Sequence, residues 1–287
     1  MLGSFYGWYM KCQSDNQTLA VIPALHQCGG KVTCSIQLIT DSQVWIETFP
    51  AEKFSRKNKC IDIGRNHFSL YGMELSIHTE ELAVEGRLSY GALTPLKYDI
   101  MGPFSLVPFM ECRHSVWSMQ HSVFGRIMLN GESYEFDHAL GYWEGDRGYS
   151  FPKKYVWTHC FFRVGSLMLS VAEIPVLGFP FIGKSISFTG VIGIVWWRGK
   201  EFRFATYLGA RVVENADGRL RVVQKGMELE VRLLETGGYP LKAPELGNMV
   251  RTIHESASCR AFYRLHIQGE SVFAFETERA SFEYEYS

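Results

Sequence analysis

The sequence predicts an all-β protein made of two antiparallel β-barrels packed together, with few short helices. Apolar and polar residues alternate with a period of two along most of the chain, which is typical of half-buried strands. Apolar stripes at helical spacing never extend beyond about ten positions, and turn residues separate the short apolar runs. The chain has 287 residues, which is long for one small barrel, so we expect two.

Paired strands are predicted first in the N-terminal half. Residues 74–90 (ELSIHTEELAVEGRLSY) form two alternating strands around a turn near Thr79–Glu80. Asn130–Gly131 stands between two further alternating runs, and Asn-Gly is one of the strongest signals of a two-residue hairpin. The pattern therefore predicts hairpins rather than helices on both sides of this turn.

The C-terminal half continues the pattern. Asp217–Gly218 is a second strong hairpin turn, and residues 227–235 (MELEVRLLE) alternate apolar with charged side chains. Residues 261–286 supply three more strands. Residues 241–254 are the best place in the chain for a short helix or a structured crossover.

The most apolar segment, residues 174–197, is long enough to span a bilayer. Lys184 lies near its middle, and prolines and glycines interrupt it. Its second half runs directly into residues 198–207, with a turn at Arg198–Lys200 that predicts a hairpin. We therefore expect two buried strands here and not a membrane span.

A weak internal sequence repeat predicts where the two domains divide. Residues 7–25 and 156–177 both begin with a tryptophan and a cysteine and end in an apolar strand with Ile-Pro. Such self-similarity at about half the chain length is the signature of a duplicated unit. We predict an N-terminal barrel domain over residues 1–140 and a C-terminal barrel domain over residues 141–287.

The composition excludes several classes of function. Lys and Arg total 29 and Asp and Glu total 30, so the basic surplus of nucleic-acid-binding proteins is absent. The seven cysteines are odd in number, no CxxC pair occurs and no N-terminal apolar signal segment is present. We therefore expect a reduced protein of the cytoplasm. Cys112 and His114 share a strand face but no second ligand pair follows, and no phosphate loop exists, so we expect no metal and no cofactor.

Two acids stand among aromatic residues in GYWEGDRGYSFPKKYVWTHC, residues 141–160. Glu144 and Asp146 lie two apart, so on a strand their side chains face the same way. Their mutual repulsion and burial among rings would favour a protonated form, which acid catalysis on an apolar substrate requires. The alternative is a solvated loop in which the acids pair with Arg147, Lys153 or Lys154.

Rings and histidines near the acids complete the set of candidates. Aromatic faces can stabilise a carbocation, or they can simply be core packing. A histidine can relay a proton, or be a satisfied core residue. His114 and His121 are seven apart and point to opposite faces of a straight strand, which argues against joint ligation. We predict Glu144, Asp146 and His159 as catalytic residues, and Trp8, Tyr9, Trp143, Arg147, Trp157 and His121 as substrate-binding residues.

The motifs resemble the tocopherol cyclase family over nearly the whole chain and in order. The matching stretches are GSFYGWYMK, LAVIPAL, GPFSLVPFMECRHSVWSMQHSV, GYWEGDRGYSFPKKYVWTHC, FRFATYLGARV and LKAPELGNMVRTIHES. The family is similar to carotenoid hydratases and lipocalin-like stress proteins, which implies two lipocalin-like barrels of the calycin type. Two positions depart from the family pattern: Tyr6 stands where a glutamate is usual, and Arg147 where an aromatic residue is usual.

The resemblance implies a reaction. A tocopherol cyclase protonates an alkene of a prenylated benzoquinol, and the phenol oxygen captures the resulting cation, without redox cofactor or metal. Glu144 matches the glutamate of the family's acidic motif and would be the proton donor. Asp146 would hold the proton network, Trp157 would shield the cation, and His159 falls where plant-type members have a glutamine.

We therefore expect a tocopherol cyclase-like enzyme of the intramolecular lyase or isomerase kind. Its partner would be a hydrophobic small molecule, an isoprenoid or a prenylquinol, and not nucleic acid. The alternative is a non-catalytic, lipocalin-like binding protein for such a molecule. The sequence leaves open the oligomeric state and whether the protein touches a membrane surface.

Overall fold

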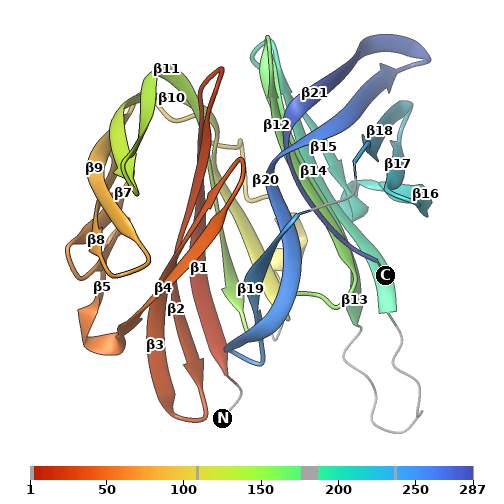
Figure 1. Ribbon diagram of the computed structural model, residues 1–287. Helices are drawn as coiled ribbons and strands as arrows, with labels where there is room; N and C mark the ends of the chain where they lie inside the picture. The colour runs from red at the N-terminus through yellow and green to blue at the C-terminus, as the bar shows by residue number, and fades with distance from the viewer. Residues whose placement is uncertain (1–2, 108–109, 176–186, 236–237, 287) are drawn as a thin grey trace, which may run out of the picture. The chain divides into compact units, whose positions relative to one another are not determined.

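The prediction of an all-β protein is confirmed. A computed structural model describes residues 3–107, 110–175, 187–235 and 238–286 (Figure 1). Two large antiparallel sheets account for nearly all of its regular structure. In the described ranges, helical turns are limited to three short 3₁₀ segments, η1 (Ala51–Lys53), η2 (Gly102–Leu106) and η3 (Thr206–Leu208).

Contacts divide the chain into two units that interleave along the sequence. Unit 1 comprises Met1–Asp99, Cys112–Phe151 and Leu241–Thr252, and unit 2 comprises Ile100–Glu111, Pro152–Pro240 and Ile253–Ser287. The predicted boundary between residues 140 and 141 lies within a strand of unit 1. The division into barrel domains over residues 1–140 and 141–287 stays a prediction.

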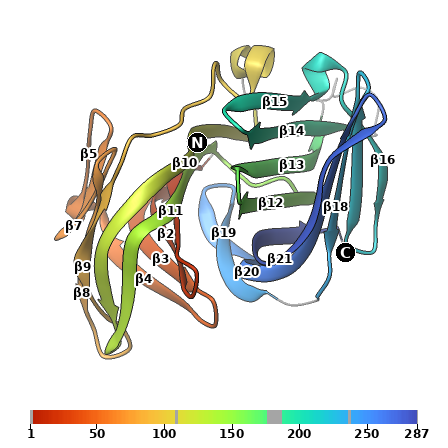
Figure 2. The ribbon, with the colours of Figure 1, turned by 90° about the horizontal axis from the view of Figure 1, so that it is seen from above.

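Unit 1 is an eleven-stranded sheet in the order β4-β3-β2-β1-β11-β10-β9-β8-β7-β6-β5. Its strands are β1 (Ser4–Gln13), β2 (Thr18–Cys28), β3 (Lys31–Thr40), β4 (Val44–Pro50), β5 (Phe54–Lys57), β6 (Cys60–Ile63), β7 (Asn66–Ser69), β8 (Gly72–His78), β9 (Ala83–Tyr90), β10 (Cys112–Leu129) and β11 (Glu132–Gly148). The sheet curls strongly (Figure 2), and β3 contacts β6 although they lie far apart in the strand order. One face therefore encloses a single hydrophobic cluster, with Ile36 and Ile61 from the two ends of the sheet.

The second sheet, which supplies most of unit 2, has ten strands in the order β15-β14-β13-β12-β21-β20-β18-β17-β16, with β19 paired to β20. Its strands are β12 (Tyr155–Phe162), β13 (Gly165–Pro175), β14 (Ser187–Trp197), β15 (Lys200–Ala205), β16 (Arg211–Ala216), β17 (Arg219–Gln224), β18 (Met227–Leu233), β19 (Tyr239–Glu245), β20 (Asn248–Ile267) and β21 (Glu270–Glu285). Residues 241–252, which include most of β19 and the start of β20, are counted with unit 1. The Gln224 side chain accepts from the Ala205 N–H and donates to the Arg203 carbonyl. A buried amide thus joins β17 to β15, two strands that are remote in the sheet order.

The two sheets repeat one strand plan. In unit 1, the meander β1–β4 begins beside β11, the last strand of the long β10–β11 hairpin; in unit 2, the meander β12–β15 begins beside β21, the last strand of the β20–β21 hairpin. Trp8 lies on β1 and Trp157 on β12. The two similar sequence segments therefore begin in β1 and β12, which are the first strands of the two meanders.

The predicted hairpin turns are present, and two expectations were wrong. Asn130 and Asp217 have positive φ of 48° and 52° and are followed by glycines with positive φ, as two-residue hairpin turns require. Residues 261–286 were expected to form three strands but form only the end of β20 and the whole of β21. Residues 241–254, expected to form a helix or crossover, instead form most of β19 and the start of β20. The pairing of these two strands with each other overrides the local proline and glycine signals.

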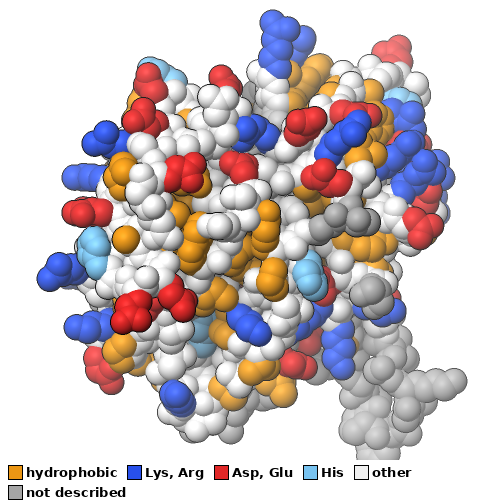
Figure 3. Space-filling view, viewed as in Figure 1, with side chains coloured by type: hydrophobic (Ala, Val, Ile, Leu, Met, Phe, Trp, Pro, Cys, Tyr) orange, Lys and Arg blue, Asp and Glu red, His pale blue; other side chains and the backbone are white. Residues whose placement is uncertain are grey.

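The apolar segment 174–197 lies only partly within the structure, because residues 176–186 fall outside the described ranges. Its second part is β14, which pairs with β15 around Arg198 and Gly199, as predicted for a hairpin. None of the helices among the described residues is long and apolar enough to cross a bilayer. Side chains of both charge signs are interspersed on the face of the molecule shown in Figure 3.

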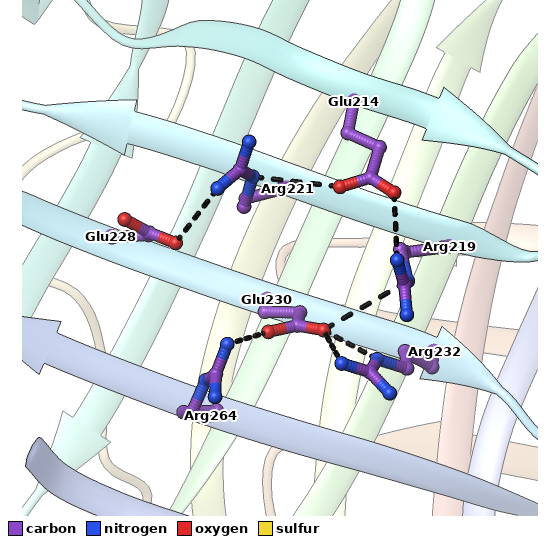
Figure 4. Close-up of polar contacts among 7 residues, drawn as sticks. All are labelled: Glu214, Arg219, Arg221, Glu228, Glu230, Arg232 and Arg264. Carbon is purple, nitrogen blue, oxygen red and sulfur yellow. Dashed lines mark hydrogen bonds and ion pairs between the residues drawn. The ribbon is translucent and has the colours of Figure 1, made fainter.

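A ladder of charged side chains crosses one face of unit 2 (Figure 4). Glu230 on β18 is its centre, because its carboxylate contacts Arg232, Arg264 and, at 4.0 Å, Arg219. The Glu230 side chain is only 4% exposed. Burial alone would raise the pKa of Glu230, but the hydrogen bond from Arg232 and the three positive charges lower it overall.

We expect Glu230→Gln to lower the free energy of unfolding by about 1.5–3 kcal/mol, the value of a hydrogen bond to a charged group. Since its folded pKa is lowered, Glu230 stabilises the fold above its ordinary value of 4.5, and this contribution is lost as pH falls through the lowered pKa. Urea unfolding at pH 7 and at pH 3 measures both effects. Glu228→Gln is the matched control: Glu228 is 3.5 Å from the half-exposed Arg221, so its loss should cost at most about 1 kcal/mol. Equal costs for the two variants would contradict the central role of Glu230.

Candidate active site

The acidic motif lies in the middle of the unit 1 sheet, on β11, between β1 and β10. Glu144 is paired in register with Tyr9 of β1 and with Val116 of β10. Asp146, two residues on, is paired with His114 of β10. The acids are therefore held by backbone pairing on both sides, and they do not lie in a loop.

His114 joins the two acids. Its Nε2 lies 3.0 Å from Glu144 Oε2, and its Nδ1 lies 2.9 Å from Asp146 Oδ1. The Tyr142 hydroxyl donates a short hydrogen bond to Glu144 Oε2, and the Cys112 thiol lies 3.4 Å from Asp146 Oδ1. These groups form one continuous chain of polar contacts from Tyr142 through Glu144, His114 and Asp146 to Cys112.

Burial makes the charges of this cluster strongly dependent on each other. Glu144 is 4% exposed and His114 is 8% exposed, while Tyr142 is fully buried. Burial alone would lower the pKa of His114, but the Glu144 and Asp146 carboxylates outweigh it and hold that pKa well above 6.5. Burial, followed by the charge of Glu144, raises the pKa of the Tyr142 hydroxyl well above its usual range. The raised pKa of His114 favours a protonated imidazole between the two carboxylates.

Arg147 does not lie beside the acids. Side chains alternate along a strand, so Arg147 points to the opposite face of β11 from Glu144 and Asp146. Arg147 makes no ion pair with any residue that the structure describes. The cationic partner of the acids is His114, and not Arg147 as the alternative of a solvated loop would have it.

Alternation also separates Glu144 from the tryptophans of unit 1. Trp8 and Trp143 belong to the enclosed core cluster, and their ring centroids lie 4.8 Å apart. Trp117 stacks on Trp143 at 5.0 Å. Of the predicted substrate-binding rings, only Tyr9 stands opposite Glu144 on the same face, whereas Trp8, Trp143 and His121 face the barrel interior.

Tyr6, at one of the two departures from the family pattern, supports the tryptophan cluster. Its hydroxyl accepts a hydrogen bond of 2.8 Å from Trp8 Nε1, and the Arg56 guanidinium lies 4.4 Å from its ring centroid. The glutamate that is usual at this position could accept a hydrogen bond from the same indole N–H. Tyr6 therefore still provides a hydrogen-bond acceptor for Trp8.

Trp157 and His159 lie in unit 2, on β12. They share the face opposite to Val156 and Cys160, which belong to the unit 2 core. Both are buried, and the His159 ring meets Phe161 edge-on at 4.6 Å. The structure therefore places the predicted catalytic residues in both units: Glu144 and Asp146 in unit 1, and His159 in unit 2.

The role of His114 was missed from sequence, because it depends on the register between β10 and β11. Tyr142 was missed as well, although its position two residues before Glu144 on a predicted strand was a usable signal. A second tyrosine–glutamate pair is present in unit 2, where the Tyr155 hydroxyl donates to Glu283, a residue paired in register with the buried Glu255.

The same three side chains are also the candidate metal ligands. One atom each from His114, Glu144 and Asp146 lies within 4.8 Å of the others. One imidazole nitrogen and two carboxylate oxygens suit several divalent cations. Both imidazole nitrogens face carboxylates here, however, so a cation would have to replace one of these contacts.

Comparison with known proteins tests the resemblance seen in the sequence. A family model described as tocopherol cyclase-like matches residues 73–212. The resemblance to tocopherol cyclases is therefore confirmed. The tocopherol cyclase-like segment contains His114, Glu144 and Asp146 and most of the rings discussed above. A search of curated proteins finds no match to the chain.

Solved structures similar to this chain share its fold. A putative AttH from Nitrosomonas europaea has a TM-score of 0.55 and 10% identity, covering 100% of this chain and 93% of its own. Kievitone hydratase from Nectria haematococca has a TM-score of 0.57 and 11% identity, covering 99% and 89%. CghA has a TM-score of 0.59 and 10% identity, covering 99% and 88%.

Proposed function

We propose that this protein is a cofactor-independent cyclase or hydratase that protonates an alkene of a prenylated quinol or another isoprenoid. The O–H bond of a Glu144 carboxylic acid breaks, and a C–H bond forms at the less substituted alkene carbon, leaving a tertiary cation. A phenol oxygen of the same molecule, or a water, then forms a C–O bond. That oxygen loses its proton to His114, which has reprotonated Glu144, so the acid is regenerated and no oxidant or reductant is needed.

The observation that carries this proposal is the buried contact of Glu144 with His114. Proton transfer to an alkene requires a strong acid in a site that excludes water. His114 holds a proton 3.0 Å from Glu144 Oε2 and can reload the carboxylate after each transfer. Asp146 fixes the ring of His114 through its other nitrogen, as a positioning residue. The tocopherol cyclase-like match and the hydratase among the similar structures support this reaction class.

A turnover assay tests the proposal. We expect the purified protein to convert a prenylated benzoquinol to a chromanol or a tertiary alcohol without any added cofactor. Activity should be unchanged in excess EDTA, because His114 and not a metal ion provides the positive charge beside the carboxylates. An enzyme inactivated by EDTA and restored by a divalent cation would contradict this assignment and favour the metal site.

The second candidate function is a binding protein for a hydrophobic small molecule without chemistry. It is favoured by the 3.0 Å contact of His114 with Glu144, because the raised pKa of His114 keeps the proton on the imidazole and away from an alkene. Tight binding of the quinol without product after long incubation would identify this function. In either case we propose a cytoplasmic location, with peripheral membrane contact as the route to an isoprenoid.

A further inference from the structure

Two buried polar atoms on the inner face of unit 1 lack hydrogen-bond partners among the described residues. They are His121 Nε2 and Trp143 Nε1. His121 is 4% exposed and Trp143 is fully buried. A buried polar atom without a partner costs free energy, so such a pair calls for a specific explanation.

The contacts of His121 define which of its nitrogens carries the hydrogen. Its Nδ1 lies 3.0 Å from Ser118 Oγ, which also lies 3.0 Å from the Gln120 carbonyl and accepts from the Thr94 N–H. A serine has one hydrogen to donate, so all three contacts are satisfied only if Ser118 donates to Gln120 and His121 Nδ1 donates to Ser118. Burial lowers the pKa of His121 to about 4, so the ring is neutral. His121 Nε2 is therefore a free acceptor, and Trp143 Nε1 is a free donor.

The acceptor, on β10, and the donor, on β11, lie on the same face of the sheet. His121 is paired in register with Gly141, and a Cβ at Gly141 would lie 2.2 Å from His121 Nε2. The imidazole thus lies directly over Gly141, and Trp143 follows two residues later on the same face. Aromatic rings pack against both side chains. The ring centroids of Tyr90 and His121 lie 4.5 Å apart, and those of Trp8 and Trp117 lie 4.8 and 5.0 Å from that of Trp143.

We propose that the interior of unit 1 binds an apolar, ring-containing molecule that carries a hydroxyl group. The hydroxyl donates to His121 Nε2, and an oxygen of the ligand accepts from Trp143 Nε1. The tryptophan rings supply the apolar contact, since aromatic faces pack favourably on ring systems. This site is distinct from the proposed proton donor, because Glu144 points to the other face of β11. The inference therefore does not depend on the proposed function.

A matched pair of probes tests the site: 4-propylphenol, and 4-propylanisole, which can accept a hydrogen bond but cannot donate one. We expect the phenol to bind about tenfold more tightly than the anisole, the effect of one hydrogen bond. It should also shift the indole N–H signal of Trp143 in ¹H–¹⁵N spectra, with Trp143→Phe assigning that signal. Glu144→Gln should bind both probes as the wild type does, which separates this site from turnover.

Two histidine variants complete the test. His121→Phe should bind the two probes equally, because the acceptor is gone. His26→Phe is the matched control: His26 is also buried, its Nε2 contacts Ser35 and its Nδ1 has no described partner, but alternation along β2 places it on the outer face. It should preserve the tenfold preference. If the wild type binds both probes equally, or the Trp143 signal does not move, ordered water satisfies the two atoms and the proposal is wrong.

Discussion

Replacing Glu144 with glutamine is expected to reduce turnover of a prenylated quinol by about 10²–10⁴-fold, the contribution typical of a general acid. Glutamine has the same shape and can still accept from the Tyr142 hydroxyl, but it cannot deliver a proton to the alkene. The loss should therefore appear in kcat, with little change in substrate binding. Steady-state kinetics on the folded variant, with far-UV circular dichroism as a check of the fold, measures this outcome.

Glu135→Gln is the control for removing a carboxylate from the same strand. Glu135 lies on β11 as well, but it is exposed and its side chain contacts only Ser133 among the described residues. We expect its turnover to match the wild type. A Glu144→Gln enzyme with wild-type kcat would remove Glu144 as the proton donor, whatever the behaviour of the control.

The second large effect is expected at His114. His114→Phe removes the imidazole that contacts both Glu144 and Asp146, and leaves the buried Glu144 carboxylate beside that of Asp146 without it. Breaking a buried ion pair in this way costs about 3–5 kcal/mol of stability. Urea unfolding at pH 6 measures the cost. His67→Phe is the matched control, since His67 contacts Asp62 at 2.6 Å but both are nearly half exposed, and its loss should cost at most about 1 kcal/mol.

The pH dependence of this difference has a definite sign. The pKa of His114 is raised in the folded protein, so its contribution is fully present below 6.5, its unperturbed value, and is lost as pH rises through the raised pKa. The stability difference between the wild type and His114→Phe should therefore be largest at pH 6 and shrink at alkaline pH. A difference that grows with pH, or one no larger than that of His67→Phe, would show that His114 is not a buried cation.

Features encoded by adjacent residues could be predicted from the sequence. The turns at Asn130–Gly131 and Asp217–Gly218 were found because two residues are sufficient to define them. Glu144 and Asp146 were expected to share a face, and the structure brings both to His114. The same alternation should have placed Trp143 on the face opposite Glu144, but the sequence analysis assigned both residues to one site.

Features that depend on the pairing of distant strands could not be predicted. Two irregularities in β10, between Val116 and Ser118 and between Ser118 and His121, each insert one extra residue relative to β11. Sequence spacing contains no signal for either. Together they leave His114 and His121 on opposite faces, as a straight strand would, and they bring His114 level with Asp146. The prediction of a helix or crossover for residues 241–254 was wrong for the same reason, because these residues form strands through the pairing of β19 with β20.

The origin of the hydrogen added to the substrate tests the central claim most directly. Turnover of a prenylated quinol in D₂O should give a product with one deuterium on the carbon next to the new C–O bond, because Glu144 is reloaded through His114 with solvent protons. Mass spectrometry and ²H NMR locate that atom. A cyclised product that contains no carbon-bound deuterium would contradict the account, since ring closure would then have occurred without protonation of the alkene.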